Sequence, residues 1–265
     1  MYQEQGFGDQ LRQWRQRRRI SQLDLAAGAE LSTRHLSFVE TGRSKPSRDL
    51  VMRLAEVLEL PLRSRNGLLL SAGFAPTYPE RPFGDAELAA AREVVQRVLD
   101  CHMPFPSLAI DRHWTLLAHN AAVGALLVGV APELLEPPVN VLRLSLHPQG
   151  LARRIVNLAE WKRHVVERLR HQIAESGDPV LEDMLEELRR MPAPASSTPA
   201  TPGLTVAVPL ILESDAGRLT FLSTTTLFGT PVEVTLSELA IESLFPADAE
   251  TAERLRQLSH SSLAG

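Results

Sequence analysis

The sequence predicts a multi-domain protein in which an all-α bundle of five helices precedes a domain of mixed α+β class. Apolar residues recur at helical spacing through the first part of the chain, whereas short apolar runs separated by turn signals begin after Pro106. Between them the stretch APTYPERPFG, 75–84, carries three prolines and is typical of a domain boundary. We therefore expect domains at 1–76 and 85–265, joined by a linker at 77–84.

The first helix is expected from Phe7 to Arg18, with Leu11 and Trp14 three residues apart on its inward side. Four arginines gather near its end, namely Arg15, Arg17, Arg18 and Arg19. They could form a patch that faces phosphate groups or simply a solvated charged surface, and the sequence leaves both readings open.

Two short helices follow within Ser21–Ser47, with almost no loop between them. Ser21 and Ser32 can each cap a helix, because a serine hydroxyl accepts a hydrogen bond from an unpaired backbone N–H of the first turn. In the second helix, the spacing of Leu36 and Val39 directs both side chains inward. The outward face is then formed by Thr33, Arg34, Ser37 and Phe38.

This outward face has the size and chemistry of a helix that reads the DNA major groove. Arg34 could donate two hydrogen bonds to a guanine. Phe38 could pack on a thymine methyl group, although such a ring belongs equally well in a core. His35 is expected to meet phosphate or solvent, since no second metal ligand lies at helical spacing. The remaining candidates for base or phosphate contacts are Gln22, Thr33, Ser37, Thr41, Arg43 and Lys45.

The same residues carry a resemblance to a known family. SQ at 21–22, LA at 25–26, LS at 31–32, and ETG followed by KPS at 40–47 resemble the xenobiotic-response-element (XRE) helix-turn-helix regulators of Cro/C1-repressor type. The resemblance implies groove contacts from Thr33, Arg34 and Phe38, and contacts with the DNA backbone from Gln22, Ser32, His35, Thr41 and Arg43. Glu30 stands where the family usually has Gly, which costs about 1 kcal/mol if the backbone stays left-handed.

Two further helices complete the expected bundle. Arg48–Leu58 places Leu50, Leu54 and Val57 on one apolar stripe. Pro61 then begins a helix that continues to about Ala72 and ends at Gly73.

Charge is divided unevenly along the chain. Residues 1–76 contain 12 Lys and Arg against 8 Asp and Glu, whereas the remainder contains 16 against 24. A basic first domain followed by an acidic remainder indicates that only the first domain binds a nucleic acid. Cys101 is the only cysteine, the N-terminus lacks an apolar signal core, and no stretch reaches the length of a bilayer span, so we expect a cytoplasmic protein with no membrane partner.

The second domain is expected to begin with a helix from Asp85, its cap, to about Cys101. Strands at 107–111 and 114–120 follow, and Asn120 is expected to cap an apolar helix at 121–130. The other expected elements are helices at 151–176 and 178–191, a flexible exposed loop at 192–203, and strands at 204–213, 218–228 and 232–236.

The order strand, turn, strand, Asn, helix resembles the opening of a PAS-type sensor domain, and 85–259 as a whole resembles the MmyB-like ligand-binding domain of bacterial regulators. The second resemblance is carried by PPVNVLRLSLHPQGLARRIVNLAEWKRHVVERLR at 137–170 and LSTTTLFGTPVEVTLSELAIESLFPAD at 222–248. It implies a PAS-like sheet flanked by helices, with a pocket for a small molecule.

The composition of these segments favours an apolar or amphiphilic ligand, because Leu, Val, Ile and Phe dominate and few charges converge. A fatty acid, with its acyl chain, is one candidate. Arg154, Asn157 and Trp161 lie at helical spacing and could bind its polar head group, although a structural or solvated role explains them as well. The threonines 224–226 are expected to be ordinary strand residues.

The sequence shows none of the common motifs of catalysis, metal binding and cofactor binding. The histidines show no HxxxH or HExxH spacing, and neither GxSxG nor GxxxxGK[ST] occurs. Cys101 and His102 are sequence neighbours, which does not place a nucleophile beside its base. We therefore expect no catalytic residues, no metal, no cofactor and no enzymatic activity.

The sequence thus predicts a transcriptional regulator that binds a double-stranded DNA operator as a homodimer and whose second domain responds to a small ligand. The alternative is a DNA-binding protein whose second domain only dimerises or docks a partner.

Overall fold

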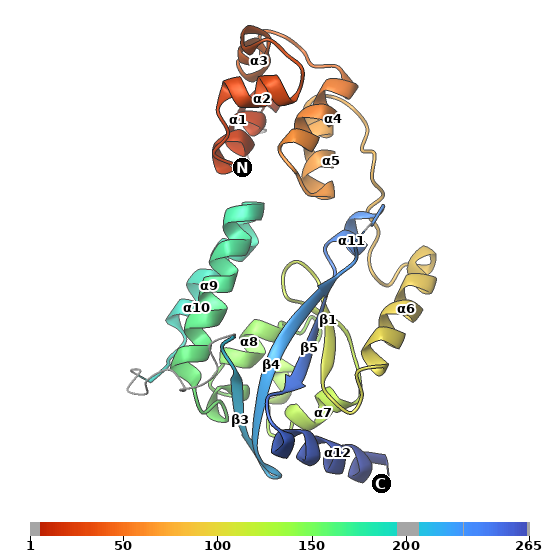
Figure 1. Ribbon diagram of the computed structural model, residues 1–265, viewed down its shortest axis with the longest axis vertical. Helices are drawn as coiled ribbons and strands as arrows, with labels where there is room; N and C mark the ends of the chain where they lie inside the picture. The colour runs from red at the N-terminus through yellow and green to blue at the C-terminus, as the bar shows by residue number, and fades with distance from the viewer. Residues whose placement is uncertain (1–5, 195–206, 230, 264–265) are drawn as a thin grey trace. The chain divides into compact units, whose positions relative to one another are not determined.

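The computed structural model describes residues 6–194, 207–229 and 231–263, and its chain divides into two compact units (Figure 1). The first unit comprises the residues up to Arg81 together with 231–237, and the second comprises Pro82–Gly229 and the residues from Glu238 onward. An N-terminal helical region followed by helices and a curled antiparallel sheet confirms the predicted fold class. The segment 231–237 joins the first unit although it follows most of the second in sequence.

The first unit contains the five expected helices, which are α1 Phe7–Arg17, α2 Gln22–Gly28, α3 Thr33–Glu40, α4 Arg48–Val57 and α5 Leu62–Ser71. Both predicted serine caps are confirmed. The Ser21 hydroxyl accepts a hydrogen bond from the Asp24 amide, and the Ser32 hydroxyl accepts one from the His35 amide, each at 3.1 Å. The core is built from the side chains that the helical spacing directs inward, among them Leu11, Leu25, Leu36, Val39, Leu50, Leu54 and Leu68.

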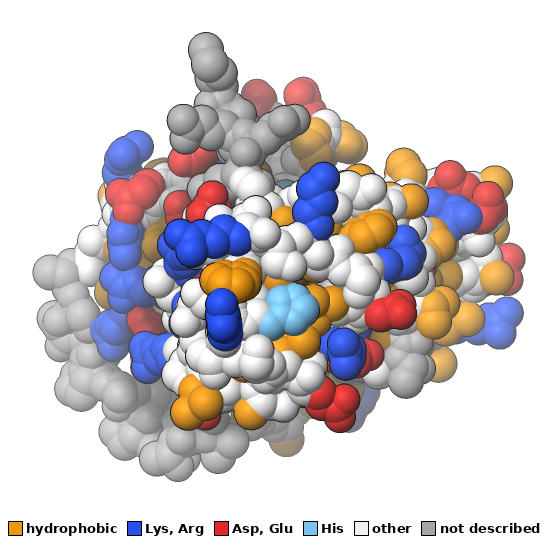
Figure 2. Space-filling view, turned by 90° about the horizontal axis from the view of Figure 1, so that it is seen from above, with side chains coloured by type: hydrophobic (Ala, Val, Ile, Leu, Met, Phe, Trp, Pro, Cys, Tyr) orange, Lys and Arg blue, Asp and Glu red, His pale blue; other side chains and the backbone are white. Residues whose placement is uncertain are grey.

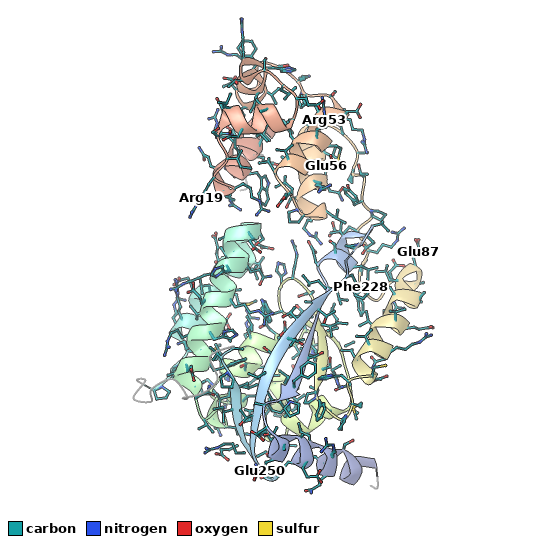
Figure 3. All side chains as sticks on the ribbon, in the orientation of Figure 1. Arg19, Arg53, Glu56, Glu87, Phe228 and Glu250 are labelled. Carbon is teal, nitrogen blue, oxygen red and sulfur yellow. The ribbon has the colours of Figure 1, made fainter. Side chains whose placement is uncertain are left out.

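Three of these helices end in a residue other than glycine with left-handed backbone. Arg19 after α1 has φ 55°, Glu30 after α2 has φ 55°, and Glu59 after α4 has φ 49° (Arg19 is labelled in Figure 3). Glu30 therefore keeps the backbone for which glycine is favoured, and the turn between α2 and α3 keeps its geometry at an energetic cost.

The first unit also holds the short helix α11, Val234–Ser237, which packs against α5. The Val234 side chain is fully buried, and the Val234 amide donates a hydrogen bond to the Pro79 carbonyl at 2.9 Å. The buried Glu233 carboxylate accepts hydrogen bonds from the Arg81 and Leu236 amides at 2.9 and 2.8 Å. The strand predicted at 232–236 is thus wrong, because this segment pairs with loop backbone rather than with a neighbouring strand.

The second unit is organised around a five-stranded antiparallel sheet in the order β2-β1-β5-β4-β3. Its strands are β1 Ser107–Ile110, β2 Leu116–His119, β3 Leu210–Ser214, β4 Gly217–Leu227 and β5 Ala240–Pro246. The first part of the loop predicted at 192–203 has no regular secondary structure, and the rest of it, with the start of the strand predicted at 204–213, lies outside the described residues.

Helices cover both faces of this sheet (Figure 1). Because side chains alternate along a strand, Leu108 and Ile110 of β1 pack toward α9, whereas Ala109 packs toward α6 on the opposite face. The bounds of the helices are α6 Ala89–Asp100, α7 Ala122–Leu126, α8 Val141–Leu146, α9 Leu158–Ser176, α10 Pro179–Arg190 and α12 Ala249–Leu263, with 3-10 turns at Ala86–Leu88, Pro132–Leu134 and Leu151–Arg153.

Asn120 does not cap a helix as predicted. Its side chain is buried and ties three backbone segments together: its oxygen accepts a hydrogen bond from the Ser107 amide at 3.1 Å, and its nitrogen donates to the Leu99 and Phe105 carbonyls. The helix that follows begins at Ala122 without a side-chain cap and is much shorter than predicted. The helix predicted at 151–176 is likewise broken, since α9 begins only at Leu158.

Candidate functional site

The outward face of α3 is exposed in the first unit. Thr33, Arg34 and His35 are exposed, and Phe38 is half-buried. The Arg34 guanidinium carbon lies 5.4 Å from the centroid of the Phe38 ring, and that of Arg43 lies 6.0 Å from it. Phe38 is therefore covered by two cations rather than packed in the core. Figure 2 shows Lys and Arg side chains and a histidine among the exposed side chains of one face.

Several of the other predicted DNA-contact residues are already held by hydrogen bonds. The Thr41 hydroxyl donates to the Ser37 carbonyl at 2.7 Å, and Ser32 is used as the cap of α3. The Gln22 amide nitrogen donates to the Glu40 carboxylate at 2.7 Å. Arg43 and Lys45 are exposed in the loop after α3. The contacts of all these residues with DNA remain predictions.

Glu40, at the end of α3, has a fully buried carboxylate. The Arg15 guanidinium donates to both of its oxygens, at 2.6 and 3.0 Å. Burial alone would raise the pKa of the Glu40 carboxyl, but hydrogen bonds from Arg15 and Gln22 and the charges of Arg15 and Arg12 outweigh it and lower that pKa. Arg15 thus joins α1 to α3. It therefore belongs neither to a phosphate-facing patch nor to a solvated charged surface, the two roles that the sequence left open.

Arg18, from the same arginine cluster, is also engaged within the bundle. Its guanidinium donates to the carbonyls of Leu58 and Glu59 at 3.1 and 3.2 Å, and so bonds the end of α4 to the end of α1. Arg17 and Arg19 are exposed. The basic surface at this end of α1 is therefore smaller than the sequence suggests.

The second unit contains a partly open apolar cavity of about 120 Å³ between the sheet and helices α7, α8 and α9. Its size is close to that of engineered cavities that bind small apolar molecules. The apolar part of its wall is formed by Leu108, Trp114, Leu116, Val123, Leu126, Leu127, Val141, Leu142, Leu144, Leu151, Trp161, Val165, Leu210 and Leu244.

Five polar side chains complete the wall, and they come from α8, α9, β4 and β5, as Ser145, His164, Arg168, Ser223 and Glu242. The Arg168 guanidinium forms a two-point ion pair with the buried Glu242 carboxylate, in which Nη1 lies 3.2 Å from Oε2 and Nη2 contacts Oε1. Arg168 also donates to the Thr225 hydroxyl at 2.7 Å and lies 4.5 Å from the centroid of the Trp114 ring.

The predicted head-group residues separate into two places. Trp161 lines the cavity, and its indole nitrogen donates to the Ser145 hydroxyl at 2.8 Å. Arg154 instead donates to the backbone carbonyls of Leu126, Val128 and Glu213. Asn157 bonds the backbone of Pro209 and Ile211. Arg154 and Asn157 therefore hold β3 in place, and their contact with a ligand stays a prediction.

The sequence did not indicate Arg168, His164 or Glu242 as site residues. The only available signal was Glu242 itself, a carboxylate within the otherwise largely apolar strand AIESLFP. Its partner lies 74 positions away in sequence, and helical spacing cannot reveal such a pair. Within the described residues no cluster of His, Cys, Asp and Glu could hold a metal ion. Among the described helices, none combines the length and apolar composition needed to cross a bilayer.

Comparison with known families gives two matches. The family described as MmyB-like transcription regulator ligand binding domain matches residues 91–258, and a family described as helix-turn-helix domain matches residues 7–67. No curated protein matches the chain. Among solved structures, an RNA-binding Light-Oxygen-Voltage receptor aligns at 13% identity with a TM-score of 0.29, over 96% of this chain. The chain spans 62% of the length of that receptor.

Proposed function

Because the chain belongs to the family of MmyB-like transcription regulators, we propose that it binds operator DNA through α3 as a homodimer and that a small apolar or amphiphilic ligand in the cavity modulates this binding. The two family matches support a regulator in which a helix-turn-helix DNA-binding domain is joined to a ligand-binding domain. The cavity wall supports an apolar or amphiphilic ligand, since apolar side chains form most of it.

A homodimer follows from the small size of the recognition surface. One helix of eight residues contacts few base pairs, whereas a two-fold dimer reads two half-sites about one helical turn apart. A fatty acyl chain is a suitable occupant for a wall made of Leu, Val and Trp side chains. We further propose that the protein acts in the cytoplasm, where its DNA partner lies, and that it binds its ligand without converting it.

The connection between β4 and β5 offers a route from the cavity to the DNA-binding unit. Ser223 of β4 and both Glu242 and Leu244 of β5 line the cavity. The chain between these strands contributes 231–237 to the first unit, where Val234 is fully buried. A ligand that shifts β4 against β5 would therefore pull on a segment anchored beside α5. This pull would change the fraction of dimers whose two DNA-binding domains fit the two half-sites.

The proposal is tested by native mass spectrometry of freshly purified protein, followed by denaturing extraction and measurement of DNA affinity before and after extraction and refolding. We expect a dimer with a reproducible added mass, and a change in DNA affinity when the added molecule is removed. A bare dimer whose DNA affinity never responds to added amphiphiles would support the alternative, in which the second domain only dimerises or docks a partner.

A replacement within the connecting segment tests the proposed route separately. Val234→Ala should leave ligand binding unchanged but weaken the effect of ligand on DNA affinity, because it loosens the anchor beside α5. Val232→Ala is the matched control, since Val232 is exposed in the same segment. Equal ligand responses in both variants would exclude this route.

A further inference from the structure

The polar end of the cavity contains two opposite charges that already compensate one another. Arg168 donates to both oxygens of the Glu242 carboxylate and lies over the Trp114 ring. The Thr225 hydroxyl donates to Oε1 of Glu242 at 2.8 Å and accepts from Arg168. Both Arg168 and Glu242 line the cavity, so any charged group that approaches one of them also meets the other.

This arrangement penalises both signs of charge on a ligand. A carboxylate that bonded to Arg168 would lie within a few ångströms of Glu242, and an ammonium group that bonded to Glu242 would lie equally close to Arg168. In a site with low local dielectric, like charges at such a distance repel strongly, and a charge also loses its hydration on entry. Neither ion gains a partner that is free to pair with it.

His164, one helical turn before Arg168 on α9, also lines the cavity. Its ring lies 5.4 Å from that of Trp161, and within the described residues its nitrogens form no hydrogen bond. Desolvation, together with the nearby charge of Arg168, lowers the pKa of the His164 imidazole, although Glu242 opposes this. A neutral imidazole offers one N–H donor and one nitrogen acceptor, which complement a hydroxyl or carbonyl group.

We propose that the cavity selects an amphiphile with a neutral, hydrogen-bonding head group, such as an alcohol, ester or amide, and that His164 binds this head while the Arg168–Glu242 pair excludes ionised heads. The inference rests on the proposed ligand-binding function and makes it more specific. It places the polar contact on α9 at His164 rather than on Arg154 and Asn157, whose side chains bond to backbone. An ionised fatty acid is then a poor ligand, whereas its neutral derivatives are good ones.

Three probes with the same ten-carbon chain test the selection in the full-length protein freed of co-purified lipid. Isothermal titration calorimetry at pH 8 compares 1-decanol, decanoate and decyltrimethylammonium. We expect 1-decanol to bind at least about ten-fold more tightly than either ion, since each ion meets a like charge. Decanoate or decyltrimethylammonium binding as tightly as 1-decanol would overturn the inference and leave the proposed function standing. If none of the probes bound, both would fail.

Glu242→Gln changes the selection without changing the shape of the cavity. It removes the negative charge and leaves Arg168 uncompensated, so decanoate should gain about ten-fold in affinity while 1-decanol changes less than about two-fold. Glu167→Gln is the matched control, because Glu167 is exposed on α9 and pairs with Arg170 rather than facing the cavity. Unchanged decanoate affinity in a folded Glu242→Gln protein would contradict the role of the pair.

His164→Leu tests the proposed head-group contact. The apolar replacement should weaken 1-decanol binding about five-fold through loss of one hydrogen bond, while decane is bound no less tightly than by the unaltered protein. His171→Leu serves as control, since His171 is exposed two turns further along α9. If 1-decanol bound equally well to both variants, His164 would not be the residue that binds the head. The comparison of probes on the unaltered protein stays decisive even if a variant fails to fold.

Discussion

Glu40 in the first unit and Glu242 in the second are both buried carboxylates that accept hydrogen bonds from an arginine. Their surroundings differ. The side chain of Glu40 is fully enclosed and its donors, Arg15 and Gln22, come from α1 and the start of α2. Glu242 borders a cavity, and its partner Arg168 is a third exposed.

The difference separates a structural ion pair from one that can act on a ligand. An enclosed pair holds helices in one arrangement, because removal of either partner leaves a buried charge without compensation. A pair at the wall of a cavity meets whatever enters, so its charges also decide which ligand binds. The same residue types therefore serve the DNA-binding unit through rigidity and the ligand-binding unit through selection.

The largest expected effect on stability comes from replacing Glu40. Glu40→Gln should lower the free energy of unfolding of the first unit by about 3 kcal/mol, because Arg15 then stays largely buried without its countercharge. Urea unfolding followed by tryptophan fluorescence and circular dichroism measures this loss. Glu56→Gln is the control: Glu56 is exposed on α4, where Figure 3 labels it, and its replacement should cost less than about 0.5 kcal/mol. Equal losses would refute the structural role of Glu40.

The pH dependence of this loss provides an independent check. The pKa of Glu40 is lowered in the folded state, so its contribution to stability is present above the unfolded pKa of about 4.3 and is lost as pH falls through the folded pKa. We expect the difference in stability between the unaltered protein and Glu40→Gln to be constant from neutral pH to about pH 5 and to shrink below about pH 4. A difference that persisted undiminished at lower pH would show that the charge is not its cause.

The two units also differ in how far the sequence predicted them. In the first, Ser21 caps α2 and Ser32 caps α3, in which Leu36 and Val39 are spaced to face inward, and these are local signals. In the second, Asn120 was predicted as a cap because it precedes an apolar run. It bonds instead to three backbone segments that only the folded chain brings together.

In the candidate sites, too, local signals were predicted from the sequence and contacts between distant segments were not. The exposed face of α3 follows from helical periodicity alone, and Trp161, which was chosen by spacing as a head-group contact, lines the cavity. The pair Arg168–Glu242 was missed, since a helix and a strand far apart in sequence contribute one residue each. Arg154 and Asn157 were chosen by spacing, but spacing does not reveal that backbone carbonyls already bind their side chains.

Arg34 extends the comparison to an arginine without a carboxylate partner within the described residues. It is exposed and lies over Phe38, so its charge is available to DNA. Arg34→Ala should weaken binding to the preferred operator by about 1–3 kcal/mol and relax the preference at one base pair. Selection from a randomised DNA pool, followed by affinity measurement, tests both effects. Arg53→Ala is the control for loss of a positive charge, because Arg53 is exposed on α4 (Figure 3).

A loss of affinity shared equally by all DNA sequences would mean that Arg34 contacts only phosphate. In that case the slope of affinity against salt concentration should decrease by about one for the variant, because one fewer counterion is released.

The effect of Glu242→Gln on stability tests the comparison between Glu40 and Glu242. We expect a loss of about 1.5 kcal/mol in the free energy of unfolding of the second unit, because the adjoining cavity gives the uncompensated Arg168 room to relax. The value should be about half of that for Glu40→Gln, measured under the same conditions. An equal or larger loss would mean that the pair at the cavity is as enclosed as the one in the helical bundle.

The smallest effect is expected at Glu30, a carboxylate that is neither buried nor part of a strong pair. Its oxygen lies 3.7 Å from the Arg53 guanidinium, and both side chains are well exposed, so the pair contributes little. The left-handed backbone of Glu30 instead decides the effect of a replacement on stability. Glu30→Gly should raise the free energy of unfolding of the first unit by about 0.5–1 kcal/mol, measured by urea unfolding. Glu30→Ala separates the two causes, because it removes the carboxylate but keeps the Cβ atom. Stabilisation by alanine as large as that by glycine would place the cause in the charge rather than in the backbone.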